Sequence, residues 1–170
     1  MKKLQATLCA AVLMTAGFAA VNQRPPHQEQ NALDWISTSP QHTILSGLII
    51  DTGMRDTLRG VGPHTVFAPT DEAFRKLPEG KLDEMRGDPA KLRDLLSYHI
   101  VSGRFSATDL QGMDRVTSIL IQKTGPATLR LRWENSTLMV NDAKVVLQDT
   151  WVSNGVVHSV DTVLVPAPVR

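Results

Sequence analysis

Hydrophobic residues in the first half of the chain recur every three to four positions, which is the spacing of one face of an α-helix. One such face runs through residues 44–49, and we expect its helix to begin with Ser-Pro at 39–40, because proline is tolerated at the first helical position. A second face runs through residues 92–96, behind the start signal Asp-Pro at 88–89. The first half is therefore predicted to be mainly helical.

Between these helices, a short strand is predicted to lead directly into a further helix. Residues 65–68 read TVFA and favour a strand. Thr70 then suits an N-cap, because its hydroxyl can accept a hydrogen bond from a free amide of the first turn. Asp71 follows at a position where the helix dipole favours negative charge. Phe74 lies one turn further on, and we expect it to be buried.

The second half of the chain switches to alternation with a period of two, which is typical of half-buried strands. In residues 128–133 apolar side chains alternate with polar ones that include Arg130 and Arg132. This pattern predicts a strand with a basic outer face. The Asn-Ser-Thr triplet at 135–137 is predicted to turn the chain, and it is also an N-glycosylation sequon whose use depends on the host.

Asn154-Gly155 is the strongest hairpin signal in the chain, because both residues tolerate the positive φ that a type I′ turn requires. The following segment, 156–165, is rich in β-branched residues and predicts a long buried strand that ends at Pro166. Helices early in the chain and strands late in the chain predict an α+β domain.

Three blocks follow one another in the sequence: TVFAPTDEAF over 65–74, Tyr98-His99 within LLSYHIVSG, and NGVVHSVDTVLVP over 154–166. Together they resemble the first signature box, the central Tyr-His motif and the second signature box of the fasciclin domain family. The resemblance covers residues 32–167. It implies the fold of that family, an α+β wedge of two small packed β-sheets with several helices from the N-terminal half on one side.

The resemblance also implies that the three blocks build the buried interior. The residues to which it gives this structural role are Thr70, Asp71, Phe74, Tyr98, His99, Asn154, Gly155 and His158. It further suggests that the Tyr-His motif packs against the first box. A buried imidazole needs hydrogen-bond partners, so we expect Thr70 or Asp71 to bind His99.

The first 19 residues differ in composition from the rest of the chain. Lys2 and Lys3 precede an apolar run, and small residues at Gly17 and Ala19 suit a signal peptidase, so residues 1–19 are predicted to be a secretory signal peptide. The run is shorter than the roughly 20 residues that span a bilayer. Residues 20–30 are expected to form a flexible lead, and residues 31–167 one fasciclin-like domain.

Removal of the predicted signal peptide changes the charge and the thiol content. Without Lys2 and Lys3 the formal net charge of +1 becomes −1, and the single cysteine is also lost. A balanced charge argues against a nucleic-acid partner. A mature chain without cysteine has no disulfide and no thiolate metal site, so a packed core must stabilise it. The signal peptide predicts a secreted or periplasmic protein.

No catalytic signature is present in the sequence, and we expect no catalytic residue, no cofactor and no metal site. His158, Ser159 and Asp161 superficially suggest a hydrolase triad, but on a strand Ser159 points away from His158. The sequence therefore favours a non-enzymatic binding or adhesion module. The alternative is a periplasmic carrier or sensor of a small lipid or sugar, which would need an apolar pocket of a few hundred cubic ångströms.

The candidate binding residues are the basic ones of the second half. Lys123, Arg130, Arg132 and Lys144 could form a face that contacts acidic polysaccharide or phospholipid headgroups, or they could simply be solvated. The resemblance implies partners of the cell surface or matrix, either protein or polysaccharide. The sequence leaves the identity of the partner and the oligomeric state open.

Overall fold

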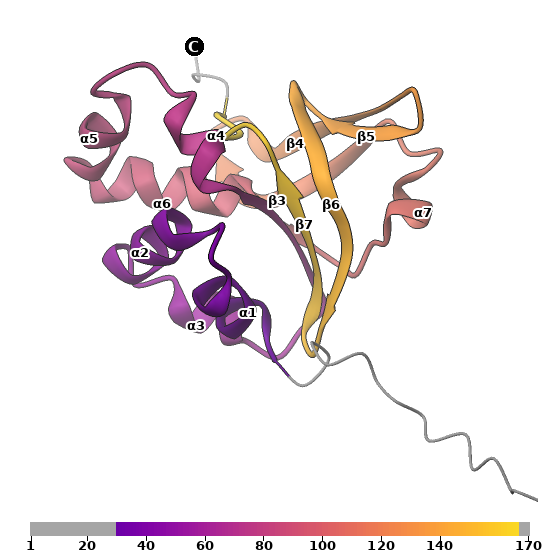
Figure 1. Cartoon of the computed structure of the whole chain (residues 1–170), viewed down its shortest axis with the longest axis horizontal. Coiled ribbons are helices and arrows are strands. Elements are labelled where there is room, and N and C mark those ends of the chain that lie inside the picture. Colours follow the sequence, from indigo (N-terminus) through magenta and orange to yellow (C-terminus); the bar gives the residue numbers. More distant parts are fainter. Residues whose placement is uncertain (1–29, 167–170) are drawn as a thin grey trace, which may run out of the picture.

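The computed structural model describes residues 30–166, so the predicted signal peptide and nearly all of the predicted lead lie outside the described residues. Within this range helices dominate the first half and strands the second (Figure 1). The helices are α1 (Ala32–Thr38), α2 (Thr43–Asp51), α3 (Arg55–Arg59), α4 (Asp71–Arg75), α5 (Lys81–Arg86), α6 (Pro89–Tyr98) and α7 (Ala107–Leu110). The strands are β1 (His64–Pro69), β2 (Ile100–Ser102), β3 (Arg115–Gln122), β4 (Gly125–Glu134), β5 (Thr137–Val140), β6 (Ala143–Val152) and β7 (Gly155–Val160).

The strands are hydrogen-bonded in chain order into one closed circuit. Consecutive strands pair antiparallel. The circuit closes where β1 pairs in parallel with β7, from His64 opposite Gly155 to Pro69 opposite Val160. The predicted α+β class is confirmed, and the two expected sheets are joined at their edges.

β1 and β7 form a wall between two hydrophobic cores. On one side Val66 and Val157 pack with the helices, and on the other Phe67 packs with Leu129 and Leu138 inside the strand circuit. Figure 1 shows α1, α2 and α3 on one side of β7, with β4, β5 and α7 on the opposite side. Because both faces of this wall are covered, both strands are almost fully buried.

The helical half begins earlier than the hydrophobic pattern predicted. α1 was not expected; the Asn31 side chain starts it by accepting a hydrogen bond from the Asp34 amide at 2.9 Å. The expected helix start at 39–40 is wrong, because these residues belong to the turn after α1 and α2 begins at Thr43. An asparagine just before an apolar helix face is a capping signal that would have revealed α1.

The two hairpin turns differ from the expected chemistry. At the β4–β5 turn Asn135 and Ser136 have φ of 48° and 65°, as a type I′ turn requires. At the β6–β7 hairpin Val152 pairs with Gly155, and neither Asn154 nor Gly155 has a positive φ, so the type I′ prediction there is wrong. Glycine is required at 155 for close packing instead, because a Cβ would overlap the main-chain carbonyl of His64 on β1.

β7 is also shorter than predicted, since it ends at Val160 rather than at Val165. Asp161 leaves the strand and accepts hydrogen bonds from the Lys144 amide at 2.8 Å and from Lys76 Nζ at 3.0 Å. Beyond it the chain continues as a C-terminal segment (162–165) without strand structure, in which Val163 and Leu164 are buried.

Candidate functional site

Thr70 and Asp71 join the first block to neighbouring elements. Thr70 caps α4 by accepting from the Ala73 amide at 3.3 Å. Asp71 accepts from the Ile44 amide at 2.9 Å and from the Thr43 hydroxyl at 2.7 Å, so it caps α2 from a different helix. Partial burial alone would raise the pKa of Asp71, but the hydrogen bonds from Ile44 and Thr43 outweigh this effect and leave the pKa below its ordinary value.

His99 is buried, and both of its ring nitrogens are engaged. The Leu164 amide donates to Nε2 at 3.0 Å, so Nδ1 carries the proton and donates to the Leu95 carbonyl at 2.8 Å. The expected partners Thr70 and Asp71 are therefore wrong. The motif does lie against the first block, because the Phe67 amide donates to the His99 carbonyl at 2.9 Å. Desolvation lowers the pKa of His99 to about 4, so the ring is neutral.

His158 is a second buried imidazole with two main-chain partners. Its Nδ1 accepts from the Asp149 amide at 3.2 Å, and its Nε2 donates to the Phe105 carbonyl at 3.0 Å. Burial lowers the pKa of His158. Ser159 has a buried hydroxyl without a partner in residues 30–166, and Asp161 is bound to Lys76, so these three residues do not assemble a triad.

Asn154 and Phe74 hold the helical half together. The Asn154 side chain accepts from the Ala32 amide at 2.9 Å and donates to the Leu58 carbonyl at 2.6 Å, which ties α1 and the end of α3 to the β6–β7 turn. Phe74 is 4% exposed and belongs to the helical core. Sequence reasoning assigned Asn154 a turn conformation, whereas its side chain makes the decisive contacts.

Tyr98 and Asn141 meet at the end of α6, beside β4 and the β5–β6 turn. The Tyr98 hydroxyl donates to the Thr128 carbonyl at 3.0 Å and accepts from the Asn141 side-chain amide at 3.1 Å. The Arg130 amide donates to Asn141 Oδ1 at 2.9 Å, and the Asn141 amide donates to the Arg130 carbonyl at 2.7 Å. The end of α6 is thereby bound to β4 and to the β5–β6 turn.

An open groove of about 700 Å³ lies at this point, bounded by β3, β4, the β5–β6 turn and the C-terminal segment. We call it the arginine groove. Its polar lining is contributed by Tyr98, Arg115, Thr128, Arg130, Arg132, Asn141, Asp142 and Thr162. The structure thus brings the predicted Arg130 and Arg132 together with Arg115. It leaves the predicted Lys123 apart, in the β3–β4 turn.

The charges in the arginine groove are poorly balanced. Arg115 lies directly opposite Arg130 in the β3–β4 register, and within residues 30–166 neither forms an ion pair. Arg132 donates to the Asn141 carbonyl at 3.2 Å and lies 3.7 Å from the exposed carboxylate of Asp142. Like charges placed opposite each other on adjacent strands are destabilising unless a counter-charge is present. Sequence reasoning missed Arg115 because only the strand register places it beside Arg130.

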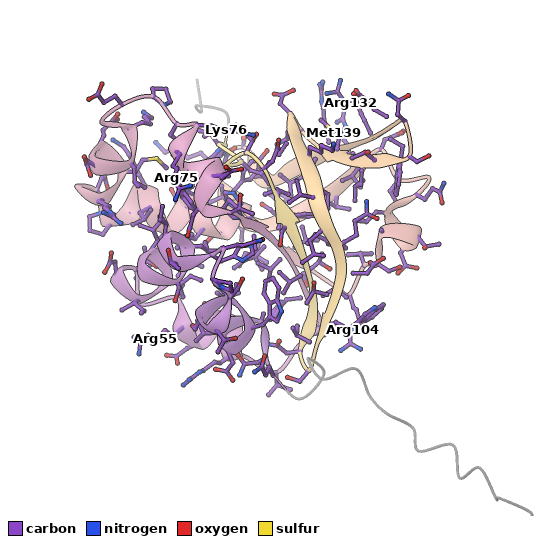
Figure 2. All side chains as sticks on the ribbon, viewed as in Figure 1. Arg55, Arg75, Lys76, Arg104, Arg132 and Met139 are labelled. Atoms are coloured by element: carbon purple, nitrogen blue, oxygen red, sulfur yellow. The ribbon has the colours of Figure 1, made fainter. Side chains whose placement is uncertain are left out.

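Arg132 also begins a cross-strand row on the same outer surface. It pairs with Met139 on β5, which pairs with Lys144 on β6. Figure 2 shows Arg132 and Met139 side by side where these strands meet. The strand register therefore places Arg115, Arg130, Arg132 and Lys144 on one outer surface.

The comparisons with known proteins agree with this architecture. The family model of the fasciclin domain matches residues 40–166. The chain belongs to the fasciclin domain family. This fasciclin domain has the same fold as a FAS1 domain pair from the insect cell adhesion molecule Fasciclin I, with a TM-score of 0.63 over 81% of this chain and 51% of that one. At 16% sequence identity, this likeness shows the fold alone.

Curated relatives of the fasciclin domain come from bacteria and animals. The chain is 36% identical over 116 residues to the cell surface glycolipoprotein MPB83 of Mycobacterium bovis, a match that covers 68% of this chain and 49% of the relative. It is 32% identical over 134 residues to the transforming growth factor-beta-induced protein ig-h3 of Sus scrofa, covering 79% of this chain and 19% of the relative. The chain thus spans half or less of the length of these relatives.

The described part of the fasciclin domain lacks two features. Between residues 30 and 166, no helix has the length and apolar character needed to cross a bilayer. In the same range, no three histidine, cysteine or acidic side chains gather as a metal site would require.

Proposed function

We propose that this fasciclin domain is a non-enzymatic binding module that acts outside the cytoplasm and contacts polymers of the cell surface, matrix or envelope. Family membership supports this proposal, together with a relative named as a cell surface glycolipoprotein. The predicted signal peptide at 1–19 supports export to the periplasm or beyond.

The observation that carries the proposal is the structural use of two buried histidines and two partly exposed aspartates. His99 and His158 use both ring nitrogens in structural hydrogen bonds, and Asp71 and Asp161 are bound to neighbouring elements. The structural engagement of these groups supports a binding role rather than acid-base catalysis. Recognition is left to the outer surface, where the arginine groove has uncompensated cations.

The alternative of a small-molecule carrier finds less support in this fasciclin domain. The apolar pocket in the helical core, between Ile36, Ile49 and Leu96, has a volume of about 10 Å³. Pockets for drug-sized ligands usually measure roughly 300–1,000 Å³. A lipid could not enter this pocket without separating the helices from the wall of β1 and β7.

A binding screen of the purified mature protein tests the proposal. We expect saturable binding to at least one immobilised cell-surface polysaccharide, envelope polymer or matrix protein, and no hydrolysis of it. The screen includes neutral and acidic polymers at two salt concentrations, since screening weakens contacts between exposed charges. Absence of binding to every polymer and protein in the screen would contradict the proposal.

A further inference from the structure

We propose that the arginine groove binds an acidic polysaccharide, with Arg115 and Arg130 sharing one carboxylate or sulfate group and Arg132 contacting the chain beside it. This inference rests on the proposed function and names the ligand class of that surface. The charges of the groove favour an anionic ligand. Arg115 and Arg130 face each other across β3 and β4 without a carboxylate partner in residues 30–166, and an oxyanion between them would supply the missing charge.

The main chain on the β4 side of the groove is held in place before a ligand arrives. Two hydrogen bonds to Asn141, at 2.9 Å and 2.7 Å, hold the main chain of Arg130. Asn141 is itself bound to Tyr98, whose ring is buried in the core of the strand circuit. A preorganised site loses less conformational entropy on binding than a mobile one. Planar guanidinium groups on such a frame suit bidentate contacts to oxyanions.

The neutral polar groups of the groove favour a sugar chain as the carrier of the anionic group. The lining mixes the arginines with neutral polar groups of Thr128 and Asn141, and the Asp142 carboxylate stands exposed at the rim beside Arg132. Amides, hydroxyls and a carboxylate provide the donors and acceptors that the hydroxyl groups of a sugar chain require. The arginines line a groove rather than a flat face, so a flat layer of lipid headgroups would contact them less well than a single extended sugar chain.

A diffuse basic surface does not explain the arrangement. The whole chain has a formal net charge of only +1, and the β3–β4 turn that carries Lys123 is separate from the arginine groove. The cations are concentrated by the strand register. A site made in this way should depend on particular arginines, whereas a diffuse surface should respond equally to the loss of any cation.

The test measures binding of the mature protein to a carboxylated alginate oligosaccharide, a sulfated heparin oligosaccharide and neutral dextran, by calorimetry. Three variants, Arg115→Gln, Arg130→Gln and Lys123→Gln, each remove one positive charge. Hydrogen bonds to charged groups contribute enough that each arginine variant should weaken binding about tenfold or more. We expect Lys123→Gln to change the affinity less than about twofold, because screening leaves little interaction with a distant exposed charge. A cooperative thermal unfolding transition at or above the midpoint of the parent protein confirms that each variant folds.

Additional measurements distinguish an arginine-dependent polysaccharide site from a diffuse basic surface and from other anionic ligands. Binding should weaken steeply as salt rises, and Arg130→Lys should fail to restore it, because lysine keeps the charge but loses the planar fork. Equal weakening by Lys123→Gln and Arg130→Gln would overturn the site. Arginine-dependent binding of polyglutamate or anionic phosphatidylglycerol vesicles that matches the oligosaccharides would overturn the ligand class. Binding of only a neutral polymer or a matrix protein, unaffected by the arginine variants, would overturn this inference and leave the proposed function standing.

Discussion

His99 connects three parts of the domain through one side chain. Its ring joins the last turn of α6 to the C-terminal segment, and its carbonyl accepts from β1. A buried donor and a buried acceptor would lose their partners together if the imidazole were removed.

His99→Ala is therefore expected to lower the free energy of unfolding by about 1–3 kcal/mol, through unsatisfied main-chain groups and lost packing. Urea denaturation at pH 7 measures the change. Lys123→Ala, at an exposed turn, is the control and should stay within about 0.5 kcal/mol of the parent protein. A loss under about 0.5 kcal/mol for His99→Ala would show that the imidazole is not a structural tie.

At the scale of elements, contacts between segments distant in the sequence decide where helices and strands meet. α2 has no side-chain cap of its own, and Asp71 of α4 supplies one. β1 and β7 approach closely enough that only glycine fits at 155. Each contact aligns two elements that the chain places far apart.

Asp71→Ala should reduce stability by about 0.5–2 kcal/mol, because the first amides of α2 lose their acceptor. The exposed neighbour Glu72 offers a control, since Glu72→Ala removes a charge from the same helix without removing that cap. Circular dichroism during thermal unfolding gives both values. Equal effects of the two substitutions would indicate that only the charge near the helix start matters.

Two glycine-to-alanine substitutions should have opposite signs. Gly155→Ala forces β1 away from β7 and is expected to cost about 1–3 kcal/mol or more. Gly47→Ala lies inside α2 with no atom within 4 Å of the new Cβ, and it should stabilise by about 0.5–1 kcal/mol. Denaturant midpoints measure both. Stabilisation by Gly155→Ala would contradict the close approach of the two strands.

At the scale of the whole molecule, buried neutral histidines make stability depend on pH. Burial lowers the pKa of His42, His99 and His158 in the folded state. Between the unfolded value of 6.5 and the folded value of about 4 for His99, the unfolded chain binds more protons than the folded one. The contribution of neutral His99 to the free energy of unfolding is thus fully present above about pH 6.5, and it is lost as the pH falls toward 4.

For His99 alone this loss should reach about 3 kcal/mol near pH 4, from roughly 1.4 kcal/mol for each pH unit of its pKa shift. Urea denaturation at pH 7, 6, 5 and 4 follows it. A His99→Gln variant cannot be protonated at this position, so its stability should fall less over the same range. Parallel curves for the two proteins would mean that His99 does not cause the acid sensitivity.

Local sequence signals were sufficient to predict several elements and the resemblance to the family. Thr70 and Asp88 cap helices as their side chains predict, and the alternation at 128–133 produces a strand with Arg130 and Arg132 facing outward. These features depend on neighbours in the chain, for which propensity and periodicity are sufficient.

Which distant groups meet was set by the packing of the folded chain. It brought Leu164 rather than Thr70 to His99, used Asp71 to cap α2, and placed Arg115 opposite Arg130. The physical reason is that strand register and the packing of helices on a shared wall set these distances, and a single sequence carries no direct signal for either. The segments that build the core could therefore be predicted from the sequence, whereas the arginine groove could be identified only in the folded structure.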